Sequence, residues 1–251
     1  MSEFAPGRLR LFNLAAGLLH AAQGALVLAL ANDFSLPVTG TFMEGPPGAD
    51  PAEPVVLLDV PFAWGVALFL FMSAAAHWLI ASPWIYPWYL RGLSRQHNDA
   101  RWVEYSFSAS LMIVLIALLT GVSDGAALLA IAGVNASMIL FGWLQERYEQ
   151  PGVGGLLPFW FGSLAGAVPW LAVGLYLWSP GVAATPPGFV VAIYVSLFLF
   201  FNVFAVNMLL QYRRVGPWRD YLFGERIYIV LSLTAKSALA WQVFAGTLAP
   251  S

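Results

Sequence analysis

Seven apolar stretches, each about as long as a bilayer is thick, constrain this chain more than any other feature. They lie at about residues 10–31, 62–81, 102–122, 125–144, 156–178, 187–212 and 226–248. A helix needs about 20 apolar residues to cross a hydrocarbon core of about 30 Å. Turn-forming residues rich in proline and glycine separate most of the stretches. The sequence therefore predicts an all-α membrane protein in which residues 1–251 form one seven-helix domain.

The composition agrees with this class and argues against several others. Hydrophobic residues make up 60% of the chain and charged residues only 10%, whereas soluble proteins average about 25% charged residues. Cysteine is absent, which excludes disulfides and thiolate sites. The three histidines are far apart, and neither an HExxH motif nor a GxxxxGK phosphate loop occurs. We expect no enzymatic activity, no catalytic residue, no metal site and no nucleic-acid partner.

The first apolar stretch has a second interpretation. Two arginines precede it and Ala29-Leu30-Ala31 ends it, as in a secretory signal peptide with its cleavage site. The stretch is long for a signal core, however, and it contains Asn13, His20 and Gln23. We expect a retained membrane span.

The arginines predict how the protein is oriented in the cell membrane. All of them fall on one side of the predicted spans: Arg8, Arg10, Arg91, Arg95, Arg101, Arg147, Arg213, Arg214, Arg219 and Arg226. The opposite side has only acidic residues: Asp33, Glu44, Asp50, Glu53, Asp59 and Asp124. The two sides sum to +4 and -6. The positive-inside rule then puts the amino terminus in the cytoplasm and the carboxyl terminus outside.

The first outer connection is too long for a simple loop. It runs for 29 residues, from Asn32 to Val60, and connections of this length are often structured. Residues 36–43 and 54–60 could pair as two short strands. An unstructured acidic loop fits the sequence equally well.

Two ionisable residues remain inside the apolar spans once the loop charges are set aside. Lys236, the only lysine, lies ten residues after Arg226, which is about 15 Å into a helix and therefore near the midplane. Glu104 reaches a similar depth if its helix begins near Gln96. Buried charges in membranes usually mark function. Two structural interpretations stay open: a Lys–Glu pair that only fixes helix packing, or a Glu104 side chain that reaches the cytoplasmic interface.

A lysine in an apolar site is chemically suited to bond an aldehyde. Desolvation favours its neutral, nucleophilic amine, and the protonated imine that follows needs one negative partner. Glu104 is the only carboxylate in a position to serve. Aromatic side chains that suit a long polyene lie in the spans: Trp102, Trp160, Trp170, Phe198, Phe200, Phe201 and Trp241. Aromatic residues are also ordinary filler of membrane helices.

Several segments resemble the heliorhodopsins, which are microbial-type retinal proteins with an inverted membrane topology. The most specific is SLTAKSALAWQ at 232–242, and the others are RWVEYS at 101–106, GVNASMILFGWLQ at 133–145, ANDF at 31–34, LPFWFG at 157–162 and SLFLFFN at 196–202. The resemblance runs through all seven spans and implies a rhodopsin-like bundle. The inverted orientation of that family agrees with the one predicted independently from the arginines.

The resemblance implies roles for individual residues. Lys236 would bind all-trans retinal through a Schiff base, and Glu104 would be its counterion. Ser232, one turn before the lysine, would lie beside both. His20 and His77 would belong to a polar cavity on the cytoplasmic side, where protons are held during the photocycle. His97 lies in a loop, and we expect it to be solvated.

The remaining expectations concern the surroundings of the retinal and the assembly. Ser108 and Gln23 are expected in the environment of the Schiff base. The residues expected to line the retinal pocket are Asn135, Met138, Trp170, Phe201 and Trp241. The family fold also implies a homodimer in the lipid bilayer, with the long outer loop ordered as a small sheet.

The third span argues against proton pumping. Outward-pumping microbial rhodopsins have a counterion, a polar residue four positions later and a proton donor eleven positions later, and here these positions hold Glu104, Ser108 and Leu115. Their second carboxylate, four residues before the lysine, is replaced by Ser232. An apolar outer half offers a proton no relay. We expect a light sensor with a slow photocycle.

The signalling partner would be an unknown cytoplasmic protein. The arginine-rich loop from Tyr212 to Arg226 is one candidate contact, although such a loop also serves as a simple positive-inside anchor. Other classes stay open: a light-driven or light-gated ion transporter, a seven-helix receptor that does not use retinal, and a small-molecule carrier using the Lys–Glu pair. Absorption of visible light after addition of retinal separates the last two from the rest.

Overall fold

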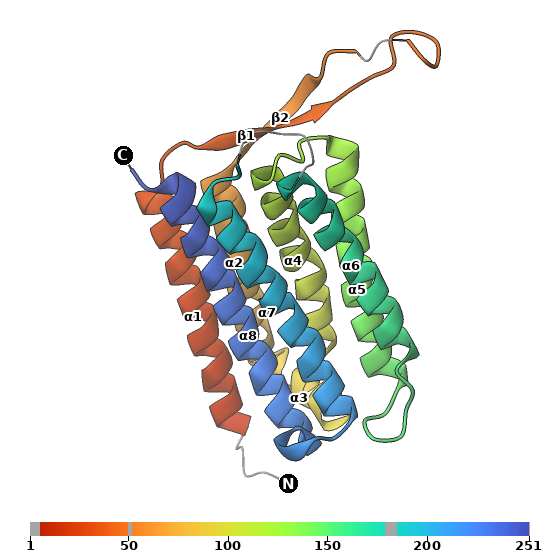
Figure 1. The fold of residues 1–251 in the computed structure, drawn as a ribbon. Coiled ribbons are helices and arrows are strands. Elements are labelled where there is room, and N and C mark those ends of the chain that lie inside the picture. Colours follow the sequence, from red (N-terminus) through yellow and green to blue (C-terminus); the bar gives the residue numbers. More distant parts are fainter. Residues whose placement is uncertain (1–5, 50–51, 179–184, 251) are drawn as a thin grey trace.

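The residues that the structure describes form an up-and-down bundle of seven long helices, each long and apolar enough to cross a membrane (Figure 1). The computed structural model describes residues 6–49, 52–178 and 185–250. Within them the long helices are α1 (Pro6–Leu30), α2 (Phe62–Ala81), α4 (Asp99–Leu119), α5 (Gly125–Tyr148), α6 (Leu157–Leu177), α7 (Gly188–Tyr212) and α8 (Tyr221–Val243). Glu3, Asp50 and residues 179–184 of the α6–α7 connection lie outside the described residues. The seven-helix prediction is confirmed.

The first outer connection contains the small sheet that the sequence left open. Strands β1 (Ser35–Gly40) and β2 (Val55–Pro61) pair in antiparallel fashion. The hairpin lies across the end of the bundle at which the carboxyl terminus emerges (Figure 1). Two contacts fix it there: the backbone N–H of Thr39 donates to the carbonyl of Ser123 at 2.8 Å, and the Asn32 side chain donates to the carbonyl of Thr247 at 2.9 Å.

Short helices occupy the opposite end of the bundle. Helix α3 (Tyr86–Ser94) lies between α2 and α4, and a single turn, η1 (Gly216–Arg219), precedes α8. Helix α4 does not extend back to Gln96 as the sequence suggested. Gln96 has a left-handed backbone with φ 61°, which a helix cannot include, and the Asn98 side chain caps α4 by accepting from the backbone N–H of Arg101.

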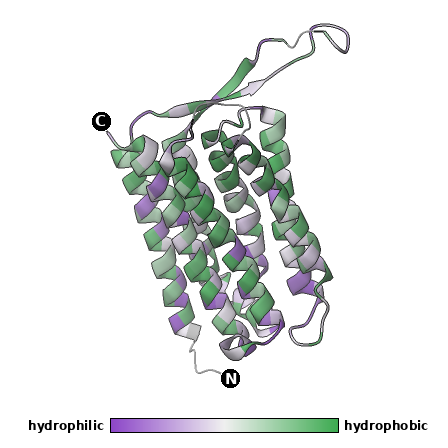
Figure 2. Ribbon diagram, viewed as in Figure 1, coloured by the Kyte–Doolittle hydropathy of each residue, from purple (hydrophilic) through white to green (hydrophobic). Residues whose placement is uncertain are grey.

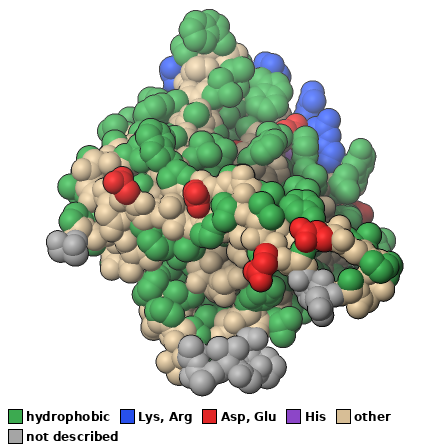
Figure 3. Space-filling view, turned by 90° about the horizontal axis from the view of Figure 1, so that it is seen from above, with side chains coloured by type: hydrophobic (Ala, Val, Ile, Leu, Met, Phe, Trp, Pro, Cys, Tyr) green, Lys and Arg blue, Asp and Glu red, His purple; other side chains and the backbone are tan. Residues whose placement is uncertain are grey.

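Charge divides the two ends of the molecule. The arginines named above all lie at the end that carries α3 and η1, and hydrophilic residues gather there in Figure 2. The hairpin end shows scattered acidic side chains, with basic ones only at its margin (Figure 3). The positive-inside rule predicts membrane orientation from this asymmetry of basic residues. Which end faces the cytoplasm stays a prediction.

The apolar core is densest in the half of the bundle nearer the hairpin. Ile113, Leu115 and Ile116 of α4 are at most 1% exposed and pack against Phe69 of α2 and Leu239 of α8. A section this apolar offers no group that could bind a proton. Neutral polar pairs interrupt it, such as Asn135 with Ser110, whereas the buried charged side chains described below lie toward the other half of the bundle.

Gly142 on α5 provides a test of how tightly the helices pack. A Cβ at this position would lie 2.6 Å from the Trp102 ring, which is held by a 2.5 Å hydrogen bond to Glu146. We expect Gly142→Ala to lower the melting temperature, because overpacking costs about 1–3 kcal/mol. Gly133→Ala on the same helix is the control, since a Cβ there has nothing within 4 Å. Equal melting temperatures for the two variants would contradict this packing.

Candidate functional site

The buried lysine and glutamate meet between α4 and α8. The Lys236 side chain is 4% exposed, and its Nζ donates to Glu104 Oε1 at 2.9 Å and to Ser232 Oγ at 3.1 Å. The three residues that the sequence predicted to lie together are therefore in direct contact. Because Glu104 points into the bundle, it does not reach the cytoplasmic interface.

A serine from α2 completes the surroundings of the carboxylate. Ser73 Oγ donates to Glu104 Oε1 at 2.6 Å, a contact that the sequence analysis missed. Its spacing held a signal, since Ser73 lies four residues before His77 and so shares its helix face. On the other side, Lys236 Nζ lies 5.1 Å from the centre of the Tyr105 ring. The carboxylate thus accepts two hydrogen bonds inside an otherwise apolar section.

An apolar cavity of about 300 Å³ is lined by residues of α4, α5, α6, α7 and α8, with Lys236 among them. Three of the residues expected to line a ligand pocket do so: Met138, Trp170 and Phe201. Trp170 meets Phe198 and Phe201 edge to face, with ring centres 5.5 and 5.3 Å apart. The cavity, called the aromatic slot below, is therefore lined largely by aromatic and other apolar side chains and includes the amine-bearing Lys236.

Three other expected residues, Gln23, Asn135 and Trp241, lie elsewhere. Trp241 does not line the cavity: it is five residues after Lys236, which at 100° per residue turns it away from the lysine face. Its Nε1 instead donates to Gln23 Oε1 at 3.0 Å, so both residues join α1 to α8 at a distance from the amine. Asn135 is buried but donates to Ser110 rather than lining the slot. Ser108, by contrast, is fully buried one turn after Glu104 on α4, beside that carboxylate, although its hydroxyl makes no hydrogen bond of good geometry among the described residues.

The two histidines of the spans lie side by side. The rings of His20 and His77 stack with centres 5.7 Å apart, and His77 Nδ1 is 2.8 Å from Asn13 Oδ1. Within the described part of the chain, neither ring nitrogen of His20 has a hydrogen-bond partner. His97, expected to be solvated, is instead largely buried, with 16% of its side chain exposed, and lies 3.6 Å from Asp99.

A small polar cavity of about 30 Å³ lies on the side of Glu104 away from the hairpin. Its polar lining comes from α1, α2, α4 and α8 and from the residue that caps α4: Asn13, Ser73, His77, Asn98, Arg101, Glu104, Tyr105 and Glu225. A cavity needs about 10–15 Å³ to hold one water molecule. There is therefore room for a water or two between the carboxylate of Glu104 and the charges beyond it.

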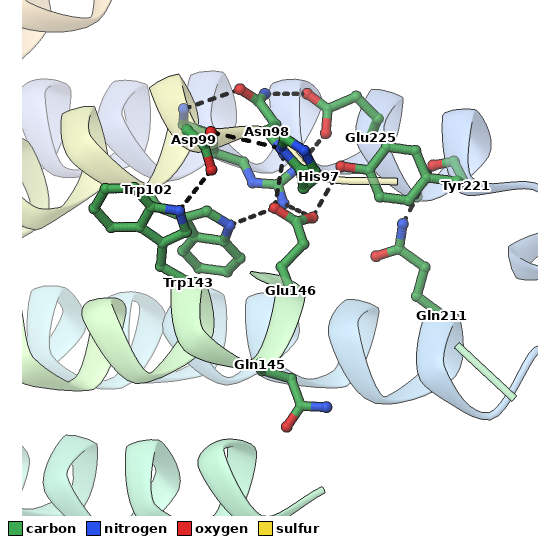
Figure 4. A network of polar contacts seen from close by, with 12 residues as sticks. His97, Asn98, Asp99, Trp102, Trp143, Gln145, Glu146, Gln211, Tyr221 and Glu225 are labelled. Atoms are coloured by element: carbon green, nitrogen blue, oxygen red, sulfur yellow. Dashed lines mark hydrogen bonds and ion pairs between the residues drawn. The ribbon is translucent and has the colours of Figure 1, made fainter. Parts of the chain in front are cut away.

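Those charges form a buried cluster that the sequence analysis did not predict (Figure 4). Arg101 of α4 bonds Glu146 of α5 at 2.5 Å and also contacts Glu225 of α8, and all three side chains are at most 4% exposed. The loop-charge count had treated them as solvated. They differ from solvated loop charges because helices α4, α5 and α8 continue beyond the predicted apolar stretches and carry these residues inside the bundle.

Neutral groups donate further hydrogen bonds to the carboxylates of Glu146 and Glu225. Glu146 accepts from Trp102 Nε1 at 2.5 Å, from the backbone N–H of Asn98 and from the hydroxyl of Tyr221 (Figure 4). Glu225 accepts from the Asn98 side chain at 2.6 Å and from Tyr89 of α3. Burial raises the pKa of Tyr89, which keeps this hydroxyl protonated as a donor. The cluster thereby joins four helices at one end.

Comparisons with known proteins agree with this geometry. The heliorhodopsin family model matches residues 9–248. Among solved structures, the crystal structure of Exiguobacterium sibiricum rhodopsin matches with a TM-score of 0.62 and 15% identity, over 94% of each chain. At that identity the likeness shows the fold. No curated protein matches the sequence.

The buried cluster predicts a contrast between two arginines. Arg101→Gln should destabilise the protein by about 3–5 kcal/mol, because it leaves two buried carboxylates without their cation. Arg147→Gln is the matched control: its side chain is half exposed and 3.4 Å from Asp99, and such pairs contribute about 0–1 kcal/mol. Thermal unfolding in detergent measures both variants. Similar losses of stability in the two variants would show that the buried cluster contributes no more than the exposed Arg147–Asp99 pair.

Proposed function

This chain belongs to the heliorhodopsin family, and we propose that it senses light through all-trans retinal joined to Lys236 as a protonated Schiff base, with Glu104 as counterion. The family and the rhodopsin fold make it a membrane-embedded protein of the retinal photoreceptor type. The observation that carries the finer proposal is the buried contact of 2.9 Å between Lys236 Nζ and Glu104 Oε1 beside the aromatic slot.

The slot fits the chromophore in chemistry and size. Its volume of about 300 Å³ falls at the lower end of small-molecule sites, and Met138, Trp170 and Phe201 offer apolar contacts within it. When bound, retinal would supply absorption of visible light and isomerisation about a double bond. The protein supplies an amine for attachment, an apolar wall that excludes water, and one negative charge.

The residues around the amine hold and receive its proton. Glu104, oriented by Ser73, stabilises a positive charge at the Lys236 nitrogen, and Ser232 offers that nitrogen a second acceptor. Away from the hairpin, His77 uses Nδ1 toward Asn13, which leaves Nε2 as an acceptor for a proton, and His20 lies stacked beside it. We assign these histidines the role of holding the proton during a slow photocycle.

Sensing rather than transport is favoured by the packing beyond the lysine. Leu115 occupies the position of a pump's proton donor and is 0% exposed, among equally buried Ile113 and Ile116. On the hairpin side the polar contacts are between neutral groups, Asn135 with Ser110 and Ser196 with Gln242. The histidines and the charges of the Arg101 cluster lie on the other side. The energy of isomerisation is then available for helix movement, with an unknown cytoplasmic protein as the receiver and no enzymatic activity of the chain itself.

Orientation and assembly complete the proposal. The arginine-rich end, including the loop from Tyr212 to Arg226, would face the cytoplasm and the hairpin end the outside. We propose a homodimer, which is supported by the apolar surface of the hairpin: Val56, Leu57 and Leu58 of β2 are each more than half exposed.

Replacement of the lysine tests the attachment. Lys236→Ala should bind retinal without forming a visible pigment, since the chain has no other lysine. The measurement is the absorption spectrum of protein purified with all-trans retinal, followed by bleaching of the parent pigment with hydroxylamine. Colour retained in the variant would reject the linkage.

Replacement of the acid tests the counterion. Glu104→Gln should lower the Schiff-base pKa by about 1–3 units and change the absorption maximum, because it removes the negative charge 2.9 Å from the nitrogen. A spectroscopic pH titration measures both effects. Asp99→Asn, on the same helix and 20% exposed, is the control and should titrate like the parent. An unchanged titration in Glu104→Gln would assign the counterion to another group.

A further inference from the structure

Arg101 is placed between two sets of carboxylates. It bonds Glu146 and Glu225, and it also lines the small polar cavity that Glu104 and Glu225 share. Arg101 and Glu104 are three residues apart on α4, so their side chains project from the same face, with Cβ atoms about 5–6 Å apart. The guanidinium is therefore the nearest further cation to Glu104 on its own helix.

The guanidinium is not fully committed to its present partners. Its Nε has no hydrogen-bond partner among the described residues, although it is buried. The group lies 3.9 Å from the centre of the Tyr228 ring and 4.7 Å from that of Trp102, contacts that permit sliding more readily than a hydrogen bond does. The adjoining polar cavity, with room for a water or two, lies between this group and Glu104.

We propose that Arg101 is a charge-controlled switch that links the Lys236–Glu104 pair to the arginine-rich ends of the helices. While Glu104 is paired with the cation on Lys236, Arg101 stays with Glu146 and Glu225. When that cation is lost, the bare carboxylate of Glu104 draws the guanidinium toward it through the polar cavity. Arg101 thus acts as a positioning residue that reports the charge state of the lysine nitrogen.

Departure of the guanidinium changes how the helices are held. Glu146 of α5 and Glu225 of α8 share one arginine, and together the three groups carry a formal charge of -1. Without the arginine, two carboxylates face each other in a site that is at most 4% exposed, where the repulsion between two negative charges is strong. The arginine-rich ends of α5 and α8 then move apart, and the hydroxyl of Tyr221, which bridges to Glu146, is strained or released.

Other groups compete for the same charges. His77 lines the cavity and, once protonated, would be a rival cation for Glu104. Tyr89, Asn98 and Tyr221 donate to the two glutamates and soften the loss of Arg101. The switch needs Arg101, rather than one of these groups, to be the preferred partner of Glu104 once the charge on Lys236 is lost.

The switch can be tested without retinal. The chain has no cysteine, so spin labels can be placed at Tyr148→Cys at the end of α5 and at Arg219→Cys just before α8, both exposed positions. Lys236→Met keeps the length of the side chain and removes its charge. We expect a longer distance between the labels than in the labelled parent, by at least the 1–2 Å or so typical of helix shifts, once the pH is high enough to ionise Glu104.

A rescue variant separates the switch from mere loss of packing. Lys236→Met with Glu104→Gln carries no bare acid and should restore the parent distance between pH of about 5 and 9. A parental distance in Lys236→Met throughout this range would overturn the proposal. So would an equally long distance in the double variant, because the lysine itself would then be responsible.

A second measurement covers the case in which Lys236→Met does not fold. The labelled parent with retinal should show the same lengthening in the light while its Schiff base is deprotonated, and an unchanged distance during proven deprotonation would overturn the switch. Only this measurement in the light rests on the proposed function. If the parent forms no pigment, the photoreceptor assignment fails. The comparison of the labelled parent with Lys236→Met, which uses no retinal, still tests the switch.

Discussion

A lysine and a glutamate buried in hydrocarbon depend on each other. Either charge alone would cost several kcal/mol at the depth of Lys236, and the contact of 2.9 Å between its Nζ and Glu104 makes the pair tolerable. The pair also fixes α8 against α4, with Ser73 of α2 holding the carboxylate. The aromatic slot, the polar cavity and the buried cluster are all arranged around this contact.

The polar groups around the pair are one-sided. Toward the hairpin the core is apolar, with Ile113, Leu115 and Leu239 at 0% exposure. Away from the hairpin lie the histidines, the small cavity and then Arg101 with its two glutamates. The charged groups nearest the lysine nitrogen, apart from Glu104, therefore lie toward one end of the molecule. Such asymmetry suits a switch whose readout is at that end.

The sequence predicted what depends on local pattern. The number of membrane spans followed from hydropathy. The contact between Lys236 and Glu104 followed from their depth, because only these two charged residues lay inside the predicted spans. Contacts that depend on rotation about a helix were harder: Trp241 turns away from the lysine, and Asn135 bonds Ser110. The buried cluster was missed because Glu146 and Glu225 lie past the apolar stretches, where hydropathy cannot tell a solvated charge from one enclosed by extended helices.

The buried cluster is hard to explain by stability alone. Apolar residues in place of a buried ion pair are often as stable or more stable, and here two acids share one base, so a surplus negative charge stays in a site that is at most 4% exposed. An arrangement that only held helices together would be better served by hydrophobic packing. A surplus anion beside a movable arginine instead keeps two conformations close in energy, which is the condition for a small charge displacement at the lysine to select between them.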